Sequence, residues 1–239
     1  MNREERELKA KNWLNHINKE YSEDIKQAID NSVLYEYSPR YVPTNILFKG
    51  TVEQFLEEFG GQARMGVLNF ASYTRPGGGF TTGAIAQEEA LCHVTTLYPV
   101  LKHFQERFYN QNTEPAPFYS DKAIFSNDII YVNQSGKPVN IAVLTCAAPN
   151  LSGCYRTAKP IPDGYEKVMR DRIKFILDIF ENNACRNIVL GAFGCGVFKN
   201  PPEVVARIFK EELIGRDFDY VYFPIPDGPN YAAFAKIFP

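Results

Sequence analysis

The sequence lacks the features that would place the protein in a membrane or outside the cell. It contains no run of about 18 apolar residues, the length that a membrane-spanning helix needs. Its charged beginning, MNREERELKAKNW, has no apolar signal-peptide core. The 5 cysteines are odd in number and show no C-x-x-C spacing, which argues against a disulfide framework or a structural zinc site. These absences predict a cytoplasmic protein with no membrane partner, no bound metal and no cofactor.

The sequence also lacks an excess of charge and the common nucleotide-binding fingerprints. Its 239 residues carry a formal net charge of −2, so the overall electrostatics indicate no nucleic-acid binder. Neither G-x-G-x-x-G nor G-x-x-x-x-G-K-[ST] occurs, which disfavours dinucleotide-dependent dehydrogenases and P-loop enzymes. The composition, 45% hydrophobic and 23% charged, is that of a globular domain. We expect a monomer that makes no direct nucleic-acid readout.

Hydrophobic periodicity predicts a helical beginning followed by alternating strands and helices. Residues 3–31 read as helical, and Thr51-Val-Glu-Gln54 has the form of a capping box for a helix that Gly60 and Gly61 end. Beyond residue 65, apolar runs predict strands and 3.6-residue spacing predicts helices. The predicted strands are 65–70, 140–149, 187–196 and 220–225, and the predicted helices are 87–104, 169–180, 201–213 and 231–238.

This alternation predicts an α/β fold in which helices cover a largely parallel or mixed sheet. Ligands of such sheets bind at the carboxyl ends of the strands. Two predicted strands end there in glycine-rich segments, LNFASYTRPGGGF and LGAFGCGVFKNPP. Glycine lets the backbone approach a ligand, and a helix that starts just after adds a positive dipole end, so both segments favour a phosphate or diphosphate. Each segment taken alone is equally well explained as the end of a strand.

Taken together, the two segments resemble a known family. The triplet GGG at 77–79 is followed, after seven residues, by QEE at 87–89. This spacing resembles the signature of the microbial type of poly(ADP-ribose) glycohydrolase, within the macrodomain superfamily. The segments TCAAPN (145–150), LGAFGCGVFKNPP (190–202) and NYAAF (230–234) are similar to the same family, so the resemblance covers residues 5–239. His93 stands where the family pattern has an arginine, and Lys199 where relatives often have a small residue.

The resemblance implies a three-layer α/β/α macrodomain with a mixed sheet. Residues 61–239 would form the catalytic core, and residues 1–60 an N-terminal helical extension packed against it. ADP-ribose, or poly(ADP-ribose) on ADP-ribosylated targets, would be the partner and would lie across the strand ends. The loop Gly194–Asn200 would wrap the diphosphate, and the GGG loop would cradle the ribose beside the scissile bond.

The expected reaction explains why a carboxylic acid is needed. Cleavage of a ribose–ribose O-glycosidic bond develops negative charge on the departing oxygen, so an acid must protonate that oxygen and then accept a proton from water. A free glutamate has a pKa of about 4.3, which burial or a like-charged neighbour raises. By the resemblance, Glu89 is the acid/base, and Glu88 and Gln87 position the ribose. Without the resemblance, two acids at a helix start are explained by the helix dipole.

The resemblance also assigns the remaining contacts. Phe198 would pack on the terminal ribose, and Asn69 and Ser72 would bond ribose hydroxyls or the catalytic loop. Asn230 and Phe234 would hold the adenine. The expected substrate-binding residues are Gln87, Gly77, Gly78, Gly79, Asn69, Ser72, Gly194, Cys195, Gly196, Val197, Phe198, Asn230 and Phe234, and the expected catalytic residues are Glu89 and Glu88.

Three functions stay open on the sequence. The leading one is hydrolysis of poly(ADP-ribose). A second is removal of single ADP-ribose units from protein or nucleic acid, which the same glutamate could perform. A third is a reader that binds ADP-ribose without cutting it, which the QEE motif disfavours because a reader needs no protonating carboxylate. Polymer and single-unit substrates differ only on the leaving-group side of the site, which the motifs do not describe. The motifs also do not distinguish cleavage at a chain end from cleavage at an internal linkage.

Overall fold

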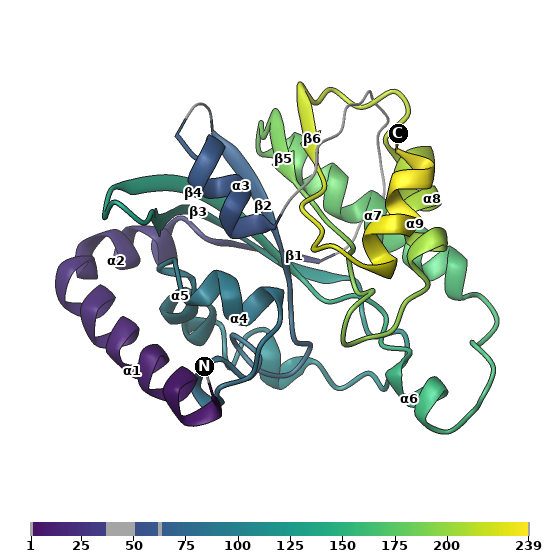
Figure 1. The fold of residues 1–239 in the computed structure, drawn as a ribbon, viewed down its shortest axis with the longest axis horizontal. Helices are drawn as coiled ribbons and strands as arrows, with labels where there is room; N and C mark the ends of the chain where they lie inside the picture. Colours follow the sequence, from purple (N-terminus) through teal and green to yellow (C-terminus); the bar gives the residue numbers. More distant parts are fainter. Residues whose placement is uncertain (1, 37–50, 62–63, 239) are drawn as a thin grey trace.

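A mixed sheet forms the centre of the computed structural model, which describes residues 2–36, 51–61 and 64–238 (Figure 1). In the described part of the chain the sheet has six strands in the order β1-β3-β4-β2-β5-β6. Strands β4, β2, β5 and β6 are mutually parallel, whereas β1–β3 and β3–β4 pair antiparallel. The strands are β1 (Val33–Glu36), β2 (Met65–Phe70), β3 (Lys122–Val132), β4 (Pro138–Cys146), β5 (Asn187–Val189) and β6 (Tyr220–Tyr222).

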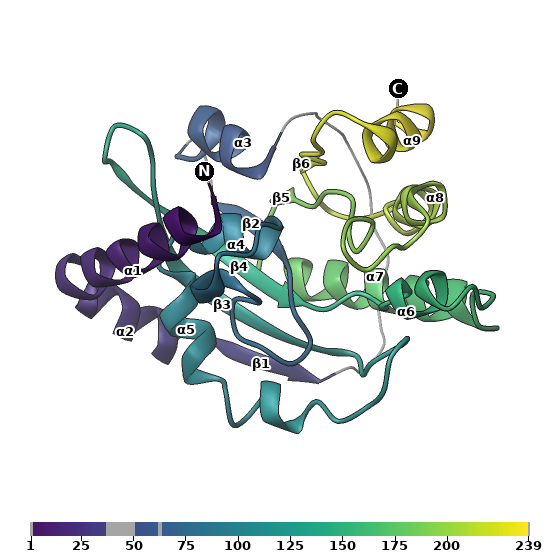
Figure 2. The same cartoon turned by 60° about the horizontal axis from the view of Figure 1, so that its bottom comes forward.

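Helices cover both faces of this sheet, as the two views show (Figures 1 and 2). One layer contains α1 (Arg3–Glu20), α2 (Ser22–Asp30), α3 (Val52–Phe59), α4 (Gln87–Cys92) and α5 (Leu97–His103). The other contains α7 (Tyr165–Asn182), α8 (Pro202–Glu212) and α9 (Pro229–Ile237), with the short α6 (Ser152–Arg156) ahead of α7.

Alternating side chains of the central strands supply two separate cores. Successive residues of a strand point to opposite faces. In β2, Val67 joins the cluster on the α1–α5 side, and the next residue, Leu68, joins the cluster on the α7–α9 side. Val143 and Leu144 divide in the same way in β4. Both faces of the sheet are therefore buried, and the predicted three-layer α/β/α fold with a mixed sheet is confirmed.

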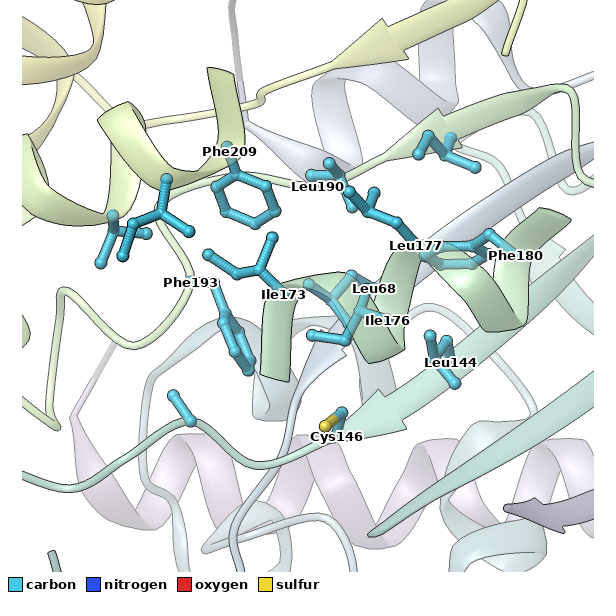
Figure 3. Close-up of a cluster of buried hydrophobic side chains, with 14 of the residues drawn as sticks. Leu68, Leu144, Cys146, Ile173, Ile176, Leu177, Phe180, Leu190, Phe193 and Phe209 are labelled. Atoms are coloured by element: carbon cyan, nitrogen blue, oxygen red, sulfur yellow. The ribbon is translucent and has the colours of Figure 1, made fainter. Parts of the chain in front are cut away.

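Figure 3 shows the core beneath α7 and α8. Leu68 and Leu144 of the sheet lie opposite Ile176 of α7, and Phe209 of α8 closes the cluster; all four are fully buried. Close packing of this kind leaves little freedom to the strands beneath it. The strand ends that carry the functional residues are thereby held in fixed positions.

Several elements differ from the sequence predictions. The predicted helix 3–31 is two helices, because the backbone leaves the helical conformation at Tyr21 (φ −127°, ψ 26°). The predicted helix 87–104 is interrupted where Thr95 forms a β-bridge with Tyr131. Strands β1 and β3 and helix α6 were not predicted. In β3 the alternation is broken by an irregular register between Ser126 and Ile129, so its period-2 signal is weak.

The described segments 2–36 and 51–60 share a core with the rest of the described chain. Ala10 of α1, Ala28 of α2 and Phe55 of α3 belong to the same cluster as Val67 and Leu97. The division into an extension (1–60) and a catalytic core (61–239), together one compact unit, stays a prediction. Within the described part of the chain, no helix is long and apolar enough to cross a membrane.

Candidate active site

A pocket of about 880 Å³ opens where the parallel strands end. Its walls come from Phe70 at the end of β2, Ala148 after β4, Gly194–Lys199 after β5 and Pro224–Asn230 after β6. This is the edge at which α/β sheets bind ligands, and the volume lies in the range of small-molecule sites. Both glycine-rich segments of the sequence therefore lead to one cavity.

The N-terminal part of the chain completes the pocket. Thr51–Glu53, at the start of α3, and Ile85–Gln87, at the start of α4, line its other wall. Two exposed apolar side chains also line it, Ile85 (73% exposed) and Val197 (65% exposed). The sequence analysis missed Thr51–Glu53 as site residues; their only signal was the capping box, which the structure contains.

Gln87 fixes α4 to the end of β2. Its Oε1 accepts a hydrogen bond from the Phe70 N–H (2.8 Å), and its Nε2 donates to the Leu68 carbonyl (2.8 Å). Strand β5 pairs with β2 only as far as Val67, so these two backbone groups lie beyond the strand ladder. The Gln87 side-chain amide makes the hydrogen bonds that a neighbouring strand would otherwise make with these two groups. The following two glutamates are thereby held over the end of β2.

Glu88 is buried among donors and is 2% exposed. Its Oε2 accepts from the Ser72 N–H (2.7 Å), its Oε1 accepts from Asn69 Nδ2 (3.2 Å), and the Gly77 N–H also donates to the carboxyl. Burial nevertheless raises the Glu88 pKa to about 8, with a smaller contribution from the Glu89 charge. Glu88 is therefore mostly protonated near neutral pH.

Glu89 is held at one oxygen only. The Gly79 N–H donates to its Oε1 (2.8 Å), and the side chain is 7% exposed. Its Oε2 makes no hydrogen bond to any described residue, and this oxygen is not fully buried. One oxygen of Glu89 thus has a fixed position and the other is available to a ligand.

The three glycines are needed because the loop folds back onto these carboxyls. Gly77 (φ 66°) and Gly78 (φ 58°) adopt left-handed conformations that other residues rarely adopt. A Cβ at Gly78 would lie 2.5 Å from Glu89 Oε1, and one at Gly79 would lie 2.5 Å from Ala84 Cβ. The seven residues between GGG and QEE in the sequence therefore allow the glycine loop to fold back and contact the two glutamates directly.

Helix α1 anchors the continuation of this loop. Arg3 Nε donates to the Thr82 carbonyl (3.0 Å), and Arg6 Nε donates to the Gly83 carbonyl (2.6 Å). Gly83 (φ 73°) has room for no side chain, since a Cβ would lie 2.7 Å from the Arg3 carbonyl oxygen. The predicted extension is thus in direct contact with the loop that holds the glutamates.

The second loop offers unpaired backbone donors. The N–H groups of Gly194, Gly196, Val197 and Phe198 make no hydrogen bond to any residue that the structure describes. Asn200 braces the loop, because its Nδ2 donates to the carbonyls of both Pro149 and Gly194 (2.8 Å each). A run of free N–H groups in a curved loop suits an anion such as a diphosphate.

The structure brings most of the predicted site residues together, but Asn69, Ser72, Gly77–Gly79, Glu88 and Glu89 lie behind Gln87 and are not among the residues that line the pocket, and Phe234 lies in the core. Ser72 and Asn69 contact Glu88, the GGG loop contacts both glutamates, and Asn230 and Phe198 line the pocket. Phe234 is 3% exposed and packs in the core against Phe223, with ring centroids 5.6 Å apart. It does not line the pocket. Phe234 and Asn230 are both in α9, and α9 turns one toward the core and the other toward the pocket.

Cysteine and histidine side chains near the site have structural surroundings. Burial raises the pKa of the Cys195 thiol, so this residue is not a thiolate near neutral pH. His93 packs edge-on against Phe80 at 4.8 Å, and burial, with a smaller effect of Lys9, lowers its pKa to about 4. Lys199 is exposed at the pocket. The described residues contain no group of three or more His, Cys, Asp or Glu that could hold a metal ion.

Arg172 is a structural residue that the sequence analysis missed. It is fully buried, and its guanidinium donates to the carbonyls of Ala147, Phe118 and Tyr119 and to the Asp121 carboxylate. It thereby ties the segment before β3 to the end of β4. The signal was an arginine on the apolar face of the predicted helix 169–180.

A free carboxyl oxygen, together with a loop of unpaired backbone N–H groups, suits the cleavage of a glycosidic bond in a nucleotide sugar. With the three-layer sheet beneath it, this site defines the class as a macrodomain hydrolase. The family model described as "Microbial-type PARG, catalytic domain" matches residues 7–134, and the chain belongs to this family of poly(ADP-ribose) glycohydrolases. The enzyme is therefore a glycoside hydrolase. A comparison with curated proteins found no match.

Solved structures support the same family over the whole chain. The poly(ADP-ribose) glycohydrolase of Thermomonospora curvata superposes with a TM-score of 0.83 at 29% identity, covering 99% of this chain and 100% of that one. The same enzyme bound to the inhibitor ADP-HPD gives 0.83 at 28% identity, with coverage of 98% and 99%. The Deinococcus radiodurans enzyme in complex with ADP-ribose gives 0.76 at 27% identity, with coverage of 89% and 96%.

We predict that Gly78→Ala abolishes most turnover. The added Cβ would displace Glu89 Oε1, and misplacement of a reacting group by about 1 Å costs roughly 100-fold in rate. Gly136→Ala is the matched control, because Gly136 has a similar φ (77°) but no atom within 4 Å of its Cβ position. Single-turnover release of ADP-ribose should fall only in the first variant. Equal rates in both would contradict a role for this contact.

We predict that Glu88→Gln changes the pH dependence of stability. The parent carboxyl has a pKa of about 8 when folded and about 4.3 when unfolded. The unfolded chain therefore loses the proton first, and the free energy of unfolding falls as pH rises between these values. Relative to the parent, Glu88→Gln should gain about 1.5 kcal/mol between pH 6.5 and 8. Denaturant unfolding at several pH values measures this, and parallel curves would contradict the raised pKa.

Proposed function

We propose that this protein hydrolyses the ribose–ribose bonds of poly(ADP-ribose) to ADP-ribose, with Glu89 as general acid and base. The observation that carries the assignment is the asymmetry of the two glutamates. Glu88 has donors on both oxygens, whereas Glu89 is fixed at Oε1 by Gly79 and has Oε2 free. A group that transfers a proton to substrate needs a fixed position and an unoccupied oxygen.

The two glutamates then have separate tasks. Glu89 Oε2 gives its proton to the departing oxygen of the glycosidic bond and afterwards takes a proton from the attacking water. Glu88 holds the loop by accepting from Ser72 and Gly77, and its raised pKa leaves it mostly uncharged near neutral pH. Asn69 supports it from below and has a buried Oδ1 without a hydrogen bond among the described residues. Because its side chain is fully enclosed, Asn69 would act by holding Glu88 rather than by contacting a ribose hydroxyl.

The rest of ADP-ribose would follow the pocket away from the glutamates. The free N–H groups of the loop 194–198 would bind the diphosphate, and Phe198 would pack on the terminal ribose. The adenine would lie along Pro224–Asn230, where Asn230 lines the pocket. Phe234 would support this segment from the core rather than stack on the base, because it is 3% exposed.

Three finer properties complete the proposal. We propose that the protein acts as a monomer in the cytoplasm and that it makes no direct nucleic-acid readout. The net charge of −2 supports the absence of nucleic-acid readout, and the 5 free cysteines support the reducing compartment. Removal of single ADP-ribose units stays the alternative activity. It would use the same Glu89 and differ only in the leaving group.

We predict that Glu89→Gln lowers turnover by at least the roughly 10²–10⁴-fold that is attributed to general acid–base catalysis. Glutamine can still accept from the Gly79 N–H but cannot cycle a proton. The affinity for free ADP-ribose should stay within about tenfold of the parent, because the proposed diphosphate contacts remain. Single-turnover release of ADP-ribose and calorimetry measure the two quantities.

Near-parental cleavage by a folded Glu89→Gln variant would remove Glu89 from the mechanism. Glu88→Gln should show a smaller defect that is spread over binding and rate. A parent enzyme that releases ADP-ribose from singly modified protein but leaves the polymer intact would preserve Glu89 and replace the substrate with the alternative.

We predict that Gly196→Glu weakens ADP-ribose binding by roughly 100-fold or more, the cost of placing an unpaired negative charge against the diphosphate. The fold should survive, since a Cβ at Gly196 meets no atom within 4 Å. Gly196→Gln adds almost the same bulk without charge and should bind more tightly than Gly196→Glu. Calorimetry with ADP-ribose compares them. Parental affinity in Gly196→Glu would place the diphosphate elsewhere.

A further inference from the structure

The order of the strands leads past the pocket to a second surface. Walls of the pocket follow β6, β5, β2 and β4 in turn, and the next strand is β3. Strand β3 runs antiparallel to β4, with Ala123 paired to Cys146, so the beginning of β3 lies at the same edge as the end of β4. The segment Phe118–Asp121 therefore lies beside the end of β4, where the Tyr119 ring meets Phe198 at the end of the loop 194–198.

An aromatic stack occupies this position. The rings of Tyr119 and Tyr73 are parallel within 9°, with centroids 3.9 Å apart. Tyr73 is 4% exposed, and its hydroxyl donates to Glu114 (2.5 Å) and accepts from the Ser120 N–H (3.1 Å). It directly follows Ser72, whose N–H binds Glu88. The stack is thus joined through one peptide bond to the residue that holds the carboxyl pair.

Tyr119 keeps its place at an energetic cost. Its φ of 59° is left-handed, a conformation that a bulky residue adopts only when its surroundings impose it. Two carbonyl contacts from buried Arg172 (3.1 Å to Phe118, 3.4 Å to Tyr119) and a bond from Asn150 Nδ2 to the Tyr119 hydroxyl (3.1 Å) impose it here. Tyr119 remains only partly buried.

The chemistry of the polymer indicates what meets this ring. In poly(ADP-ribose) the departing oxygen is a hydroxyl of an adenosine ribose, so an adenine is attached to the same sugar. That adenine is the first large apolar group beyond the scissile bond. The rings of Phe198, the proposed ribose contact, and Tyr119 form an edge-to-face pair with their centroids 6.4 Å apart. The leaving adenosine therefore falls within reach of Tyr119.

We propose that Tyr119, supported by Tyr73, is a stacking platform for the adenine of the leaving ADP-ribose unit. The inference rests on the proposed function, and it assigns the leaving-group side of that site. Stacking on an aromatic ring is sequence-tolerant and strong for a purine, and a ring fixed in advance loses little entropy on binding. A single ADP-ribose on a protein side chain brings no purine to this position. The platform therefore favours the polymer over singly modified protein.

The test compares an ADP-ribose dimer with free ADP-ribose. Tyr119→Ala removes the ring, and Tyr119→Asn removes it with a residue that accepts the left-handed backbone. Both should raise the half-saturating dimer concentration in single-turnover cleavage by about tenfold or more, the usual effect of losing one base–aromatic stack. The affinity for free ADP-ribose, measured by calorimetry, should stay within about twofold because ADP-ribose ends before the platform. Tyr119→Phe keeps the ring and should cleave the dimer with a half-saturating concentration like that of the parent.

Tyr220→Ala is the matched control. Tyr220 is 51% exposed and begins β6, so it lies at the end of the sheet away from the pocket. It should match the parent with both ligands. An unchanged half-saturating dimer concentration in Tyr119→Ala and Tyr119→Asn, or an equal loss of affinity for dimer and ADP-ribose, would overturn the platform.

Failure of the proposed function gives a different result. A parent that binds ADP-ribose but does not cleave the dimer would overturn the reaction. Calorimetry with the dimer would then test, independently of cleavage, whether Tyr119 binds the second adenine. The parent should bind the dimer more tightly than ADP-ribose, and Tyr119→Asn should lose that preference. A preference that survives in Tyr119→Asn would overturn the platform.

Discussion

The carboxyl groups of Glu88 and Glu89 accept hydrogen bonds from peptide N–H groups of the loop that precedes α4, and most of the site follows from that contact. A carboxyl loses a large solvation energy on burial, which only close donors can offset. The Ser72, Gly77 and Gly79 N–H groups supply those donors, and they come close enough only because the loop has no side chains at Gly77–Gly79. Together with Asn69, these donors bind both carboxyl oxygens of Glu88 but only Oε1 of Glu89, so Oε2 of Glu89 stays available.

The sequence alone predicts the parts of the site that are formed by residues close together along the chain. The GGG-to-QEE spacing and the second glycine-rich loop belong to this kind, as do the buried parallel strands. It does not predict β1 or β3, which are identified by their partners rather than by a clean alternation. It also misassigns Phe234 within α9, because spacing along a helix does not say which face meets the core. Arg172 was missed because a buried arginine looks, in sequence, like an exception to an apolar stripe.

The loop 77–83 is held from two directions, which relates helix α1 to the position of the glutamates. On one side it binds the glutamates at the end of β2, and on the other its Thr82 and Gly83 carbonyls accept from Arg3 and Arg6 of α1. Trp13 of α1 adds a bond to the Thr95 carbonyl, at the break between α4 and α5. The extension therefore contributes to the order of the loop as well as to the core. The proposed boundary at residue 60 therefore divides the sequence and does not separate two independently packed domains.

The free N–H groups of the loop 194–198 have a consequence for inhibition. They belong to the main chain, so substitution of a side chain cannot delete them. A competitive inhibitor anchored on them would leave few routes to resistance by point mutation. One route is proline, which removes an N–H. The other is added bulk: at Gly194 a Cβ would lie 2.4 Å from Asn200 Nδ2 and would distort the loop, and at Gly196, where a Cβ meets no atom, a side chain that excludes the inhibitor would also hinder ADP-ribose.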